Sequence, residues 1–425
     1  MAVDPRARRD RQAIRPARIY AFAEYYPDPF KPYFDTQFAH WVADGHDLSV
    51  FAFGSWGDAG HPPIAEYGLD ERTTYLPAGP TAVWRAVGRV AGAIWRSPSH
   101  FAAAAGAANG WPRRRLLRTV QGALLPAQEP DVCLVHNLMT ATSLISLRRL
   151  YPGARIALYY HGGETAGTAA PADVRAAFAD ADIVCTNTHY SRQSLLARGC
   201  PAEKVRVIPL GYDLSEFKHG EMRRRYRPDG ALRLITVSRL STEKGLTHLL
   251  DALVLAGAAG APVVCTIVGD GPERAALEHR VTELGLRRHV RFTGVMPRNR
   301  VLAEFDRADA LVLPSVPTAT WEENQACVLQ EAMLSRLMVI TTRTGGVPES
   351  IAPAMDAFAA PPSDPVALAD RICRVARLKE PELEALGRAN RAYCESRYDI
   401  RVLNPRLLSA ALGRSMTHDR TPRQG

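Results

Sequence analysis

Short apolar runs alternate with segments of helical periodicity along most of the chain. The first run, Arg18 to Ala23, is followed by a segment with Phe34, Phe38, Trp41 and Val42 on one helical face. This alternation is typical of βαβ units with a parallel sheet. The further strands expected in this half are Asp47 to Phe53, Asp131 to His136, Arg155 to Tyr160, Asp182 to Thr186 and Lys204 to Pro209.

A second series of such units begins after a polar, charged stretch from Lys218 to Gly230, which we interpret as a linker. Its expected strands are Leu232 to Ser238, Val263 to Val268, Val290 to Thr293, Ala310 to Pro314 and Met338 to Thr342. The pattern thus predicts two α/β domains, each a doubly wound parallel sheet, that face each other across a cleft. Ligands bind beyond the carboxyl ends of such strands, so the residues after each run are the candidates for chemistry.

The composition agrees with two globular domains and excludes several other classes. The chain has 425 residues, of which 46% are hydrophobic and 23% charged, as in soluble globular proteins. It has no apolar run of about 18 residues and no apolar secretory signal, so we expect a cytoplasmic protein. Its seven cysteines are odd in number, scattered and never in a CxxC pair, which argues against a disulfide framework or a zinc site.

The formal charge of +9 is concentrated in two stretches, and no nucleic-acid-binding module is recognisable. Residues 1–18 hold six arginines against two acids, and residues 73–128 hold seven arginines and no acid. Within this stretch, Arg85, Arg89 and Arg96 fall on one side of an expected helix and apolar residues fall on another. This pattern is typical of a helix on an anionic membrane surface, and equally of an arginine face exposed to water.

Two turns after strands of the second half carry candidate ligand-binding groups. Arg239 and Lys244 lie where a strand ends and a helix begins, so both cations can converge on an anion such as a diphosphate. In the next turn, Gly269 and Gly271 allow a ligand to approach the backbone closely. Taken singly, each segment also fits an ordinary surface loop or turn.

Two glutamates flank the start of another expected helix. Glu331 lies inside an apolar helical pattern, where a carboxylate without a partner or ligand would be costly. Glu323 precedes the helix by a few residues, and the backbone from Asn324 to Cys327 can offer free N–H groups. Both carboxylates suit the hydroxyls of a nucleotide sugar. The alternative is a capping role for Glu323 and a salt bridge for Glu331.

Together with the turn from Thr344 to Glu349, these segments resemble the retaining glycosyltransferases of family 4. The family pattern is R-x4-K-G after a strand, a V-G-x-G-P turn, E-x7-E followed by A-M, and a G-G-x-P-E turn, and the chain matches each in order. The resemblance implies the GT-B fold of two facing Rossmann-like domains. The loop from Glu24 to Phe30 is similar to that of the subset related to colanic-acid and capsule transferases.

The resemblance also implies roles for the residues of the second half. Arg239 and Lys244 would bind the donor diphosphate, Glu323 the transferred sugar and Glu331 the ribose. Asn324-Gln325-Ala326 departs from the Gly-Phe-Gly that the family often has at this place. The full set implied for donor binding is Gly269, Gly271, Val295, Met296, Asn324, Gln325, Ala326, Cys327 and Glu331.

In the first half the resemblance points to the acceptor side. His161, which follows a strand and precedes glycines, is similar to the family's active-site histidine, and His136 at another strand end is a candidate for acceptor contact. Tyr25, Asp35 and Glu164 are further acceptor-side candidates, with structural or capping roles as the alternative. We therefore assign catalysis to His161, Arg239, Lys244 and Glu323.

The expected activity is retaining transfer of a hexose from a nucleotide sugar, with UDP favoured, to a polysaccharide precursor or a natural product. No metal and no cofactor are expected, since no Asp-x-Asp sits at a strand end. A sugar-nucleotide 2-epimerase and a silent sugar-binding module are the alternatives. The expected domain plan is a mobile basic tail at 1–15, an acceptor domain at 16–215, a donor domain at 216–395, a helix at about 396–412 that packs back on the first domain, and a polar tail at 413–425.

Overall fold

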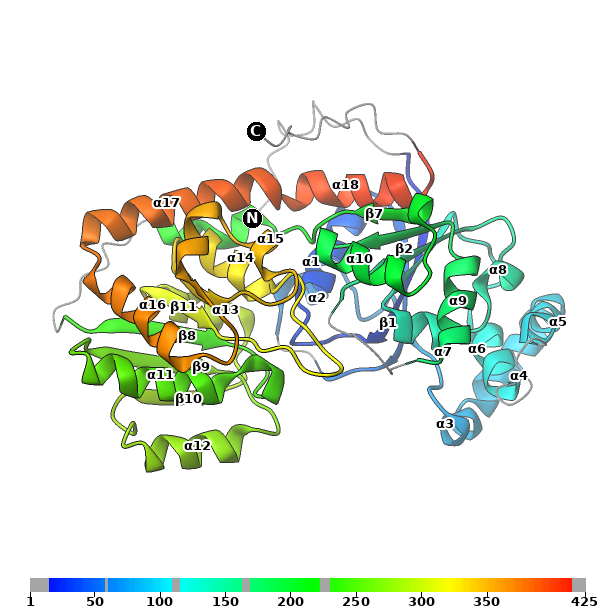
Figure 1. Cartoon of the computed structure of the whole chain (residues 1–425). Coiled ribbons are helices and arrows are strands. Elements are labelled where there is room, and N and C mark those ends of the chain that lie inside the picture. Colours follow the sequence, from blue (N-terminus) through cyan, green and yellow to red (C-terminus); the bar gives the residue numbers. More distant parts are fainter. Residues whose placement is uncertain (1–14, 58–59, 109–114, 163–168, 222–229, 415–425) are drawn as a thin grey trace.

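A computed structural model of the protein describes residues 15–57, 60–108, 115–162, 169–221 and 230–414. The chain forms two α/β domains that lie side by side (Figure 1). The expected tails therefore fall almost wholly outside the described residues. Among the helices of the described residues, none is both long and apolar enough to cross a membrane.

The N-terminal domain is built on a seven-stranded parallel sheet in the order β3-β2-β1-β4-β5-β6-β7. The order runs outward in both directions from β1 and β4, which makes a doubly wound sheet with a switch point between these two strands. The strands are β1 (Arg18–Tyr25), β2 (Asp47–Gly54), β3 (Thr73–Tyr75), β4 (Val132–His136), β5 (Arg155–Tyr160), β6 (Ile183–Thr186) and β7 (Val205–Val207).

The C-terminal domain repeats this plan with a six-stranded parallel sheet in the order β10-β9-β8-β11-β12-β13, whose switch point lies between β8 and β11. The predicted fold class, α/β of the GT-B type, is confirmed. The strands are β8 (Leu232–Val237), β9 (Val263–Val268), β10 (Val290–Gly294), β11 (Ala310–Leu313), β12 (Met338–Thr342) and β13 (Ala359–Ala360).

Every strand expected from the apolar runs is present, and two further edge strands had no usable signal. Thr73–Tyr75 and Ala359–Ala360 are three and two residues long. Such lengths are too short to show a period of two, and edge strands need no long apolar run because one side lacks a neighbour. Both extend a sheet at its edge without changing the position of the cleft.

Helices cover both faces of each sheet (Figure 1). Those of the N-terminal domain are α1 (Tyr33–Ala43), α2 (Pro62–Glu66), α3 (Pro80–Arg85), α4 (Val87–Arg96), α5 (Pro98–Ala107), α6 (Arg115–Leu124), α7 (Leu138–Ser143), α8 (Leu147–Leu150), α9 (Pro171–Asp180) and α10 (His189–Ala197). Those that follow are α11 (Leu246–Ala258), α12 (Arg274–Glu283), α13 (Arg298–Phe305), α14 (Cys327–Leu334), α15 (Val347–Ser350), α16 (Pro365–Arg377), α17 (Glu380–Arg397) and α18 (Ile400–Ala411).

The last two helices join the domains. α17 packs on α14 of the C-terminal domain, and α18 packs on α1, β5 and β6 of the N-terminal domain. Figure 1 shows the pair running along one side of both domains. Between them, the Tyr398 carbonyl accepts a hydrogen bond from the Tyr212 amide at 2.7 Å, so the chain returns beside the segment that first left the N-terminal domain.

Helices α3 to α6 project from the outer end of the N-terminal domain, away from the C-terminal domain (Figure 1). The single helix expected to carry Arg85, Arg89 and Arg96 is wrong in one respect, because Ala86 separates α3 from α4. Arg85 therefore belongs to α3, whereas Arg89 and Arg96 belong to α4. All three arginines are exposed.

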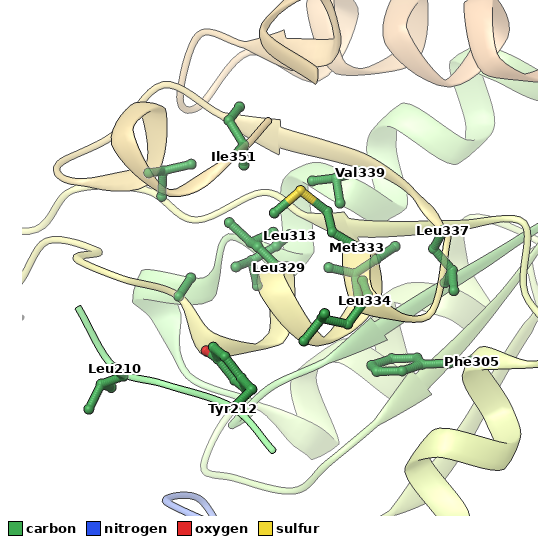
Figure 2. Packing of buried hydrophobic residues seen from close by; sticks show 14 of the residues in the cluster. Leu210, Tyr212, Phe305, Leu313, Leu329, Met333, Leu334, Leu337, Val339 and Ile351 are labelled. Atoms are coloured by element: carbon green, nitrogen blue, oxygen red, sulfur yellow. The ribbon is translucent and has the colours of Figure 1, made fainter. Parts of the chain in front are cut away.

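The core of the C-terminal domain holds α14 in place. Figure 2 shows its buried side chains Leu329, Met333 and Leu334 packed among Leu313, Val339, Ile351 and Phe305. Burying apolar side chains stabilises the fold by about 25 cal/mol per Å² removed from water. Turning the helix would expose these side chains and lose that free energy, so this face fixes the rotation of the helix. That rotation directs Glu331, on the same helix, toward the cleft between the domains.

Candidate active site

A cavity of about 930 Å³ lies between the domains, beyond the carboxyl ends of strands from both sheets. Residues from both halves line it, as expected for a cleft between two facing doubly wound sheets. The predicted site residues on its wall are Tyr25, Asp35, His161, Arg239, Lys244, Gly269, Gly271, Val295, Met296, Glu323, Asn324, Gln325, Ala326, Cys327 and Glu331.

Lys244 and Glu323 form a buried ion pair at the switch point of the C-terminal sheet. The Lys244 Nζ lies 2.7 Å from Glu323 Oε2, and both side chains are largely buried. Ser315, just after β11, donates a second hydrogen bond to the same oxygen at 2.7 Å. The Lys244 ammonium also lies 4.3 Å from the centre of the Trp321 ring. These contacts hold the cation and the carboxylate on one wall of the cleft.

Arg239 is held differently from Lys244, although both follow β8. Its guanidinium donates to Glu243 at 2.7 Å and is more than half exposed. Burial raises the pKa of Glu243, but hydrogen bonds from Ser241 and Arg239 outweigh this, so its pKa is lowered and it stays ionised. Arg239 is thus partly neutralised in the unliganded site, and an anion must compete with Glu243 for it.

Glu331 pairs with a residue that the sequence analysis missed, Arg298. The Arg298 guanidinium bridges two carboxylates, at 2.6 Å from Glu331 and 2.6 Å from Glu216. Burial lowers the pKa of Arg298, but the two carboxylates raise it by more, so it stays charged. The salt-bridge alternative for Glu331 is therefore realised. Both members of the pair still line the cleft.

The two glycines of the turn after β9 are required by close packing of backbone on backbone. A Cβ on Gly269, whose φ is +131°, would lie 1.9 Å from the Ser238 carbonyl oxygen. A Cβ on Gly271 would lie 2.4 Å from the Leu240 carbonyl oxygen. The turn thus lies directly against the loop that carries Arg239, and both turns border the cavity.

On the opposite wall, His161 and His136 form a pair of neutral imidazoles. The His136 Nδ1 and His161 Nε2 lie 2.9 Å apart. Burial lowers the pKa of His136 to about 3, and burial together with His136 and Lys31 lowers the pKa of His161 well below its usual value. His136 is 1% exposed and does not line the cavity. His136 thus lies behind His161 and supports it, and its contact with the acceptor stays a prediction.

Of the other acceptor-side candidates, Asp35 and Tyr25 line the cavity on the side of the N-terminal domain. The carboxylate of Asp35, on α1, accepts a hydrogen bond from His61 Nδ1 at 2.8 Å, and both residues line the cavity. Tyr25 packs against the exposed Trp56, with ring centres 5.1 Å apart, at the edge of the cavity. Glu164 lies outside the described residues.

The base-side residues of the predicted donor site also border the cavity. Val295 and Met296 follow β10, and about half of the Val295 side chain is exposed. Ala326 is the residue before α14, and Cys327 is its first residue. Burial raises the pKa of the Cys327 thiol to about 12, so it is an inert wall residue rather than a nucleophile.

Sequence reasoning missed Arg298, Trp321 and Ser315. Arg298 opens the helix after β10, which is the same position in a βα unit that singled out Arg239 and Lys244. The same position at the start of a helix could therefore have singled out Arg298. The contact between Trp321 and Lys244 joins residues far apart in sequence, so no local pattern indicates it.

Comparison with known proteins gives two family models that together span most of the chain. Residues 33–216 match the model described as glycosyltransferase family 4. Residues 220–393 match the model described as glycosyl transferases group 1. The boundary between the two matches falls in the segment between β7 and β8, where the chain passes from one sheet to the other.

Individual relatives include a colanic acid biosynthesis glycosyltransferase and a glucosyltransferase. The chain is 25% identical over 392 residues to the protein of Salmonella typhimurium described as colanic acid biosynthesis glycosyltransferase WcaL, covering 88% of this chain and 94% of the relative. It is 31% identical over 164 residues to the 2-deoxystreptamine glucosyltransferase of Streptomyces kanamyceticus, covering 39% and 41% respectively.

Among solved structures, the chain has the same fold as Anabaena HepE, which was crystallised with UDP-glucose. The TM-score is 0.67 at 18% identity, over 92% of this chain and 98% of HepE. The paired sheets, the four motifs in order and the two family matches agree with one another. The chain belongs to the glycosyltransferases of family 4, with the GT-B fold, and groups with their colanic-acid and capsule members.

Proposed function

We propose that the protein transfers a hexose from a UDP-sugar to a hydroxyl of a saccharide precursor, with retention of the anomeric configuration. The observation that carries this proposal is the Lys244–Glu323 pair on one wall of the cleft, with His161 on the other. A cation beside a carboxylate suits a sugar joined to a diphosphate, because one group binds phosphate and the other binds hydroxyls. Uridine is favoured as the commoner donor base in the family.

In the proposed reaction the bond from the anomeric carbon to the diphosphate breaks, and a bond to the acceptor oxygen forms on the same face of the sugar. Lys244 and Arg239 stabilise the charge on the leaving diphosphate by preorganised positive potential. A phosphate oxygen takes the proton of the acceptor hydroxyl, so the chain needs no separate nucleophile. Glu323 orients the sugar through its hydroxyls. We propose that no divalent metal is required.

A thermal-shift panel of UDP- and GDP-sugars tests the donor assignment, since a ligand that binds the native state raises the melting temperature. The proposal predicts a larger shift with UDP and its sugars than with GDP and its sugars. Product stereochemistry by NMR then tests retention of the anomeric configuration. An inverted product would contradict the proposed retaining transfer. Activity that is lost in EDTA and restored by a divalent ion would contradict metal independence.

The acceptor is the least constrained substrate, and two classes compete. The full-length likeness to WcaL supports a polysaccharide precursor, and the likeness to the 2-deoxystreptamine glucosyltransferase over 39% of the chain supports a soluble aminocyclitol. Because the polysaccharide relative covers far more of the chain, we favour that acceptor. Donor-dependent UDP release with each acceptor distinguishes them. No net UDP release with any acceptor, together with isomerisation of the UDP-sugar, would favour an epimerase.

We propose further that the projecting helices α3 and α4 dock the enzyme on the anionic inner face of a membrane that carries the acceptor. Trp84 and Trp95 are 77% and 89% exposed, and Val87 is also exposed. Within α4, Val87 and Trp95 are eight residues apart and lie along one side of the helix. Exposed tryptophans beside Arg85, Arg89 and Arg96 suit the interface of an anionic bilayer.

Flotation with vesicles that contain anionic lipid tests this docking. The wild type should float with anionic vesicles and remain at the bottom of the gradient when the vesicles are neutral. A triple Arg85/Arg89/Arg96 to Glu variant and a double Trp84/Trp95 to Ser variant should both lose binding. Val366→Ser, a change at a similarly exposed side chain on the C-terminal domain, is the matched control. Equal flotation of wild type and both variants would exclude docking on the membrane through these side chains.

A further inference from the structure

Asn324, which stands where the family often has glycine, reaches across the cleft into the N-terminal domain. Its side chain is 4% exposed. The Asn324 Nδ2 donates to the His161 backbone oxygen at 2.6 Å, and its Oδ1 accepts a hydrogen bond from the Thr188 hydroxyl. A glycine at position 324 would have no side chain to make either contact.

The opposite surface is shaped to receive this side chain. Gly162 has a φ of +80°, and a Cβ there would lie 2.4 Å from Asn324 Nδ2. On the other side, a Cβ on Gly346 would lie 2.8 Å from Asn324 Oδ1. The amide therefore fills a slot between glycines of the two domains. Any side chain at Gly162 would strain the backbone as well as the contact.

The next residue, Gln325, makes a second bridge between the domains. Its Oε1 accepts from the Leu210 amide at 2.9 Å, and its Nε2 donates to the Leu210 carbonyl oxygen at 3.3 Å. The side-chain amide thus pairs with one residue of the connecting segment as a neighbouring strand would. Gln325 is buried, so these groups would be left unsatisfied if the domains moved apart.

Glu349, in the Gly-Gly-x-Pro-Glu turn, makes the third bridge. Its two carboxylate oxygens each lie 2.7 Å from a backbone amide, of His189 and of Tyr190, at the first turn of α10. A carboxylate at a helix N-terminus is stabilised by the free amides and by the helix dipole. Here the carboxylate comes from one domain and the helix from the other.

We propose that Asn324, Gln325 and Glu349 form a domain clasp, and that Asn324 is a positioning residue that sets His161 against the sugar site of Glu323. Asn324 is the neighbour of Glu323 in sequence and holds the peptide that follows His161 in space. The clasp therefore links the donor loop directly to the histidine of the facing wall. It keeps the domains in the catalytic arrangement before the donor arrives. The inference rests on the proposed transfer reaction.

The deciding experiment compares Asn324→Ala and the isosteric Asn324→Asp with wild type. A carboxylate of the same shape cannot donate to the His161 carbonyl, so the two variants separate loss of the hydrogen bond from loss of volume. We expect kcat to fall at least about 30-fold in both, while the dissociation constant for UDP stays within about threefold. Small-angle X-ray scattering of the unliganded variants should give a larger radius of gyration.

Two further variants complete the test. Glu349→Gln keeps one acceptor oxygen and should show a smaller loss of kcat with the same unchanged UDP affinity. Glu322→Gln, next to the site but outside the cavity wall, is the control and should match wild type. All variants are compared at temperatures where their circular dichroism shows them folded.

The inference is overturned if Asn324→Ala keeps its kcat within threefold of wild type, or if UDP affinity falls as much as kcat. The second result would mean that the side chain serves donor binding rather than positioning. If wild type transfers no sugar to any acceptor, the proposed function fails. In that case the scattering comparison still tests the clasp, and an unchanged radius of gyration in Asn324→Ala and Asn324→Asp overturns it.

Discussion

The two walls of the cleft hold their buried polar groups in opposite ways. On the wall that we propose binds the donor (the donor wall: Lys244, Glu323, Arg298 and Glu331), each carboxylate faces a cation at 2.6–2.7 Å. On the facing wall, which we propose binds the acceptor (the acceptor wall), His161 and the His136 behind it form a neutral pair that shares one hydrogen bond.

Each imidazole of this pair also keeps one buried ring nitrogen that has no partner among the described residues. A buried charge must be paired even without a ligand, whereas a neutral ring nitrogen costs less to leave unsatisfied.

This difference separates the effects expected from the two walls. Substitutions on the donor wall remove one member of a charged pair, so they should weaken donor binding and lower stability together. Substitutions on the acceptor wall should lower transfer while donor affinity stays the same. The predictions below test this contrast, beginning with the largest effect.

Glu323→Gln should give the largest loss, about 10³-fold in kcat/KM for the donor. The amide cannot accept hydrogen bonds from Lys244, Ser315 and the sugar as a carboxylate does, and Lys244 loses its counter-charge. Steady-state kinetics with the best donor of the panel measure the loss. The neighbouring change Glu322→Gln should stay within threefold of wild type. Comparable losses in both would show that the effect comes from general charge rather than from this contact.

Arg298→Met should lower the free energy of unfolding by about 3 kcal/mol, because it leaves the buried Glu331 and the partly buried Glu216 without their cation. Urea denaturation followed by circular dichroism measures the change. Arg291→Met, which removes a guanidinium more than half exposed, should cost less than about 1 kcal/mol. Equal costs for the two arginines would contradict the burial argument.

Lys244→Ala should lower kcat/KM for the donor about 100-fold, and Arg239→Ala only about tenfold. Lys244 is largely buried and directed at the sugar site, whereas Arg239 is exposed and partly neutralised by Glu243. Kinetics of the two variants under the same conditions give the ratio. A larger loss for Arg239 would reverse the assignment of the principal cation.

The smallest expected effect is a loss of stability in acid that depends on the imidazole pair. The pKa of His136 is about 3 in the native protein and near its usual value in the unfolded chain. Below about pH 6.5 the unfolded chain binds protons that the native protein does not, so stability falls as pH falls.

Between pH 7.5 and 5.5 the free energy of unfolding should drop by about 1 kcal/mol from His136. Urea midpoints at both values measure it, and His136→Leu should show a shallower drop. The same slope in both proteins would show that another group titrates.

Sequence patterns could predict the fold and three of the four residues that define the donor wall, because these signals are local. Each of the expected strands was marked by its own apolar run, and Arg239, Lys244, Glu323 and Glu331 lie in short motifs near strand ends. The edge strand Thr73–Tyr75 carried no such signal.

Contacts between distant segments could not be read in this way. The bridge from Arg298 to Glu216, the pairing of His136 with His161, and the reach of Asn324 to Thr188 each join residues from different elements. Asn324 itself was visible as a departure from the family pattern. Its role in joining the domains depends on which residues face it, and that is a property of the folded cleft.

The most direct test of the account is the affinity of UDP, measured by isothermal titration calorimetry, for wild type, Lys244→Ala and His161→Ala. If the donor is held by the C-terminal domain, Lys244→Ala should weaken UDP binding at least about tenfold. His161→Ala should bind UDP within about threefold of wild type while its transfer rate falls. Equal weakening in both variants, or no UDP binding by wild type, would contradict the assignment of a donor wall and an acceptor wall.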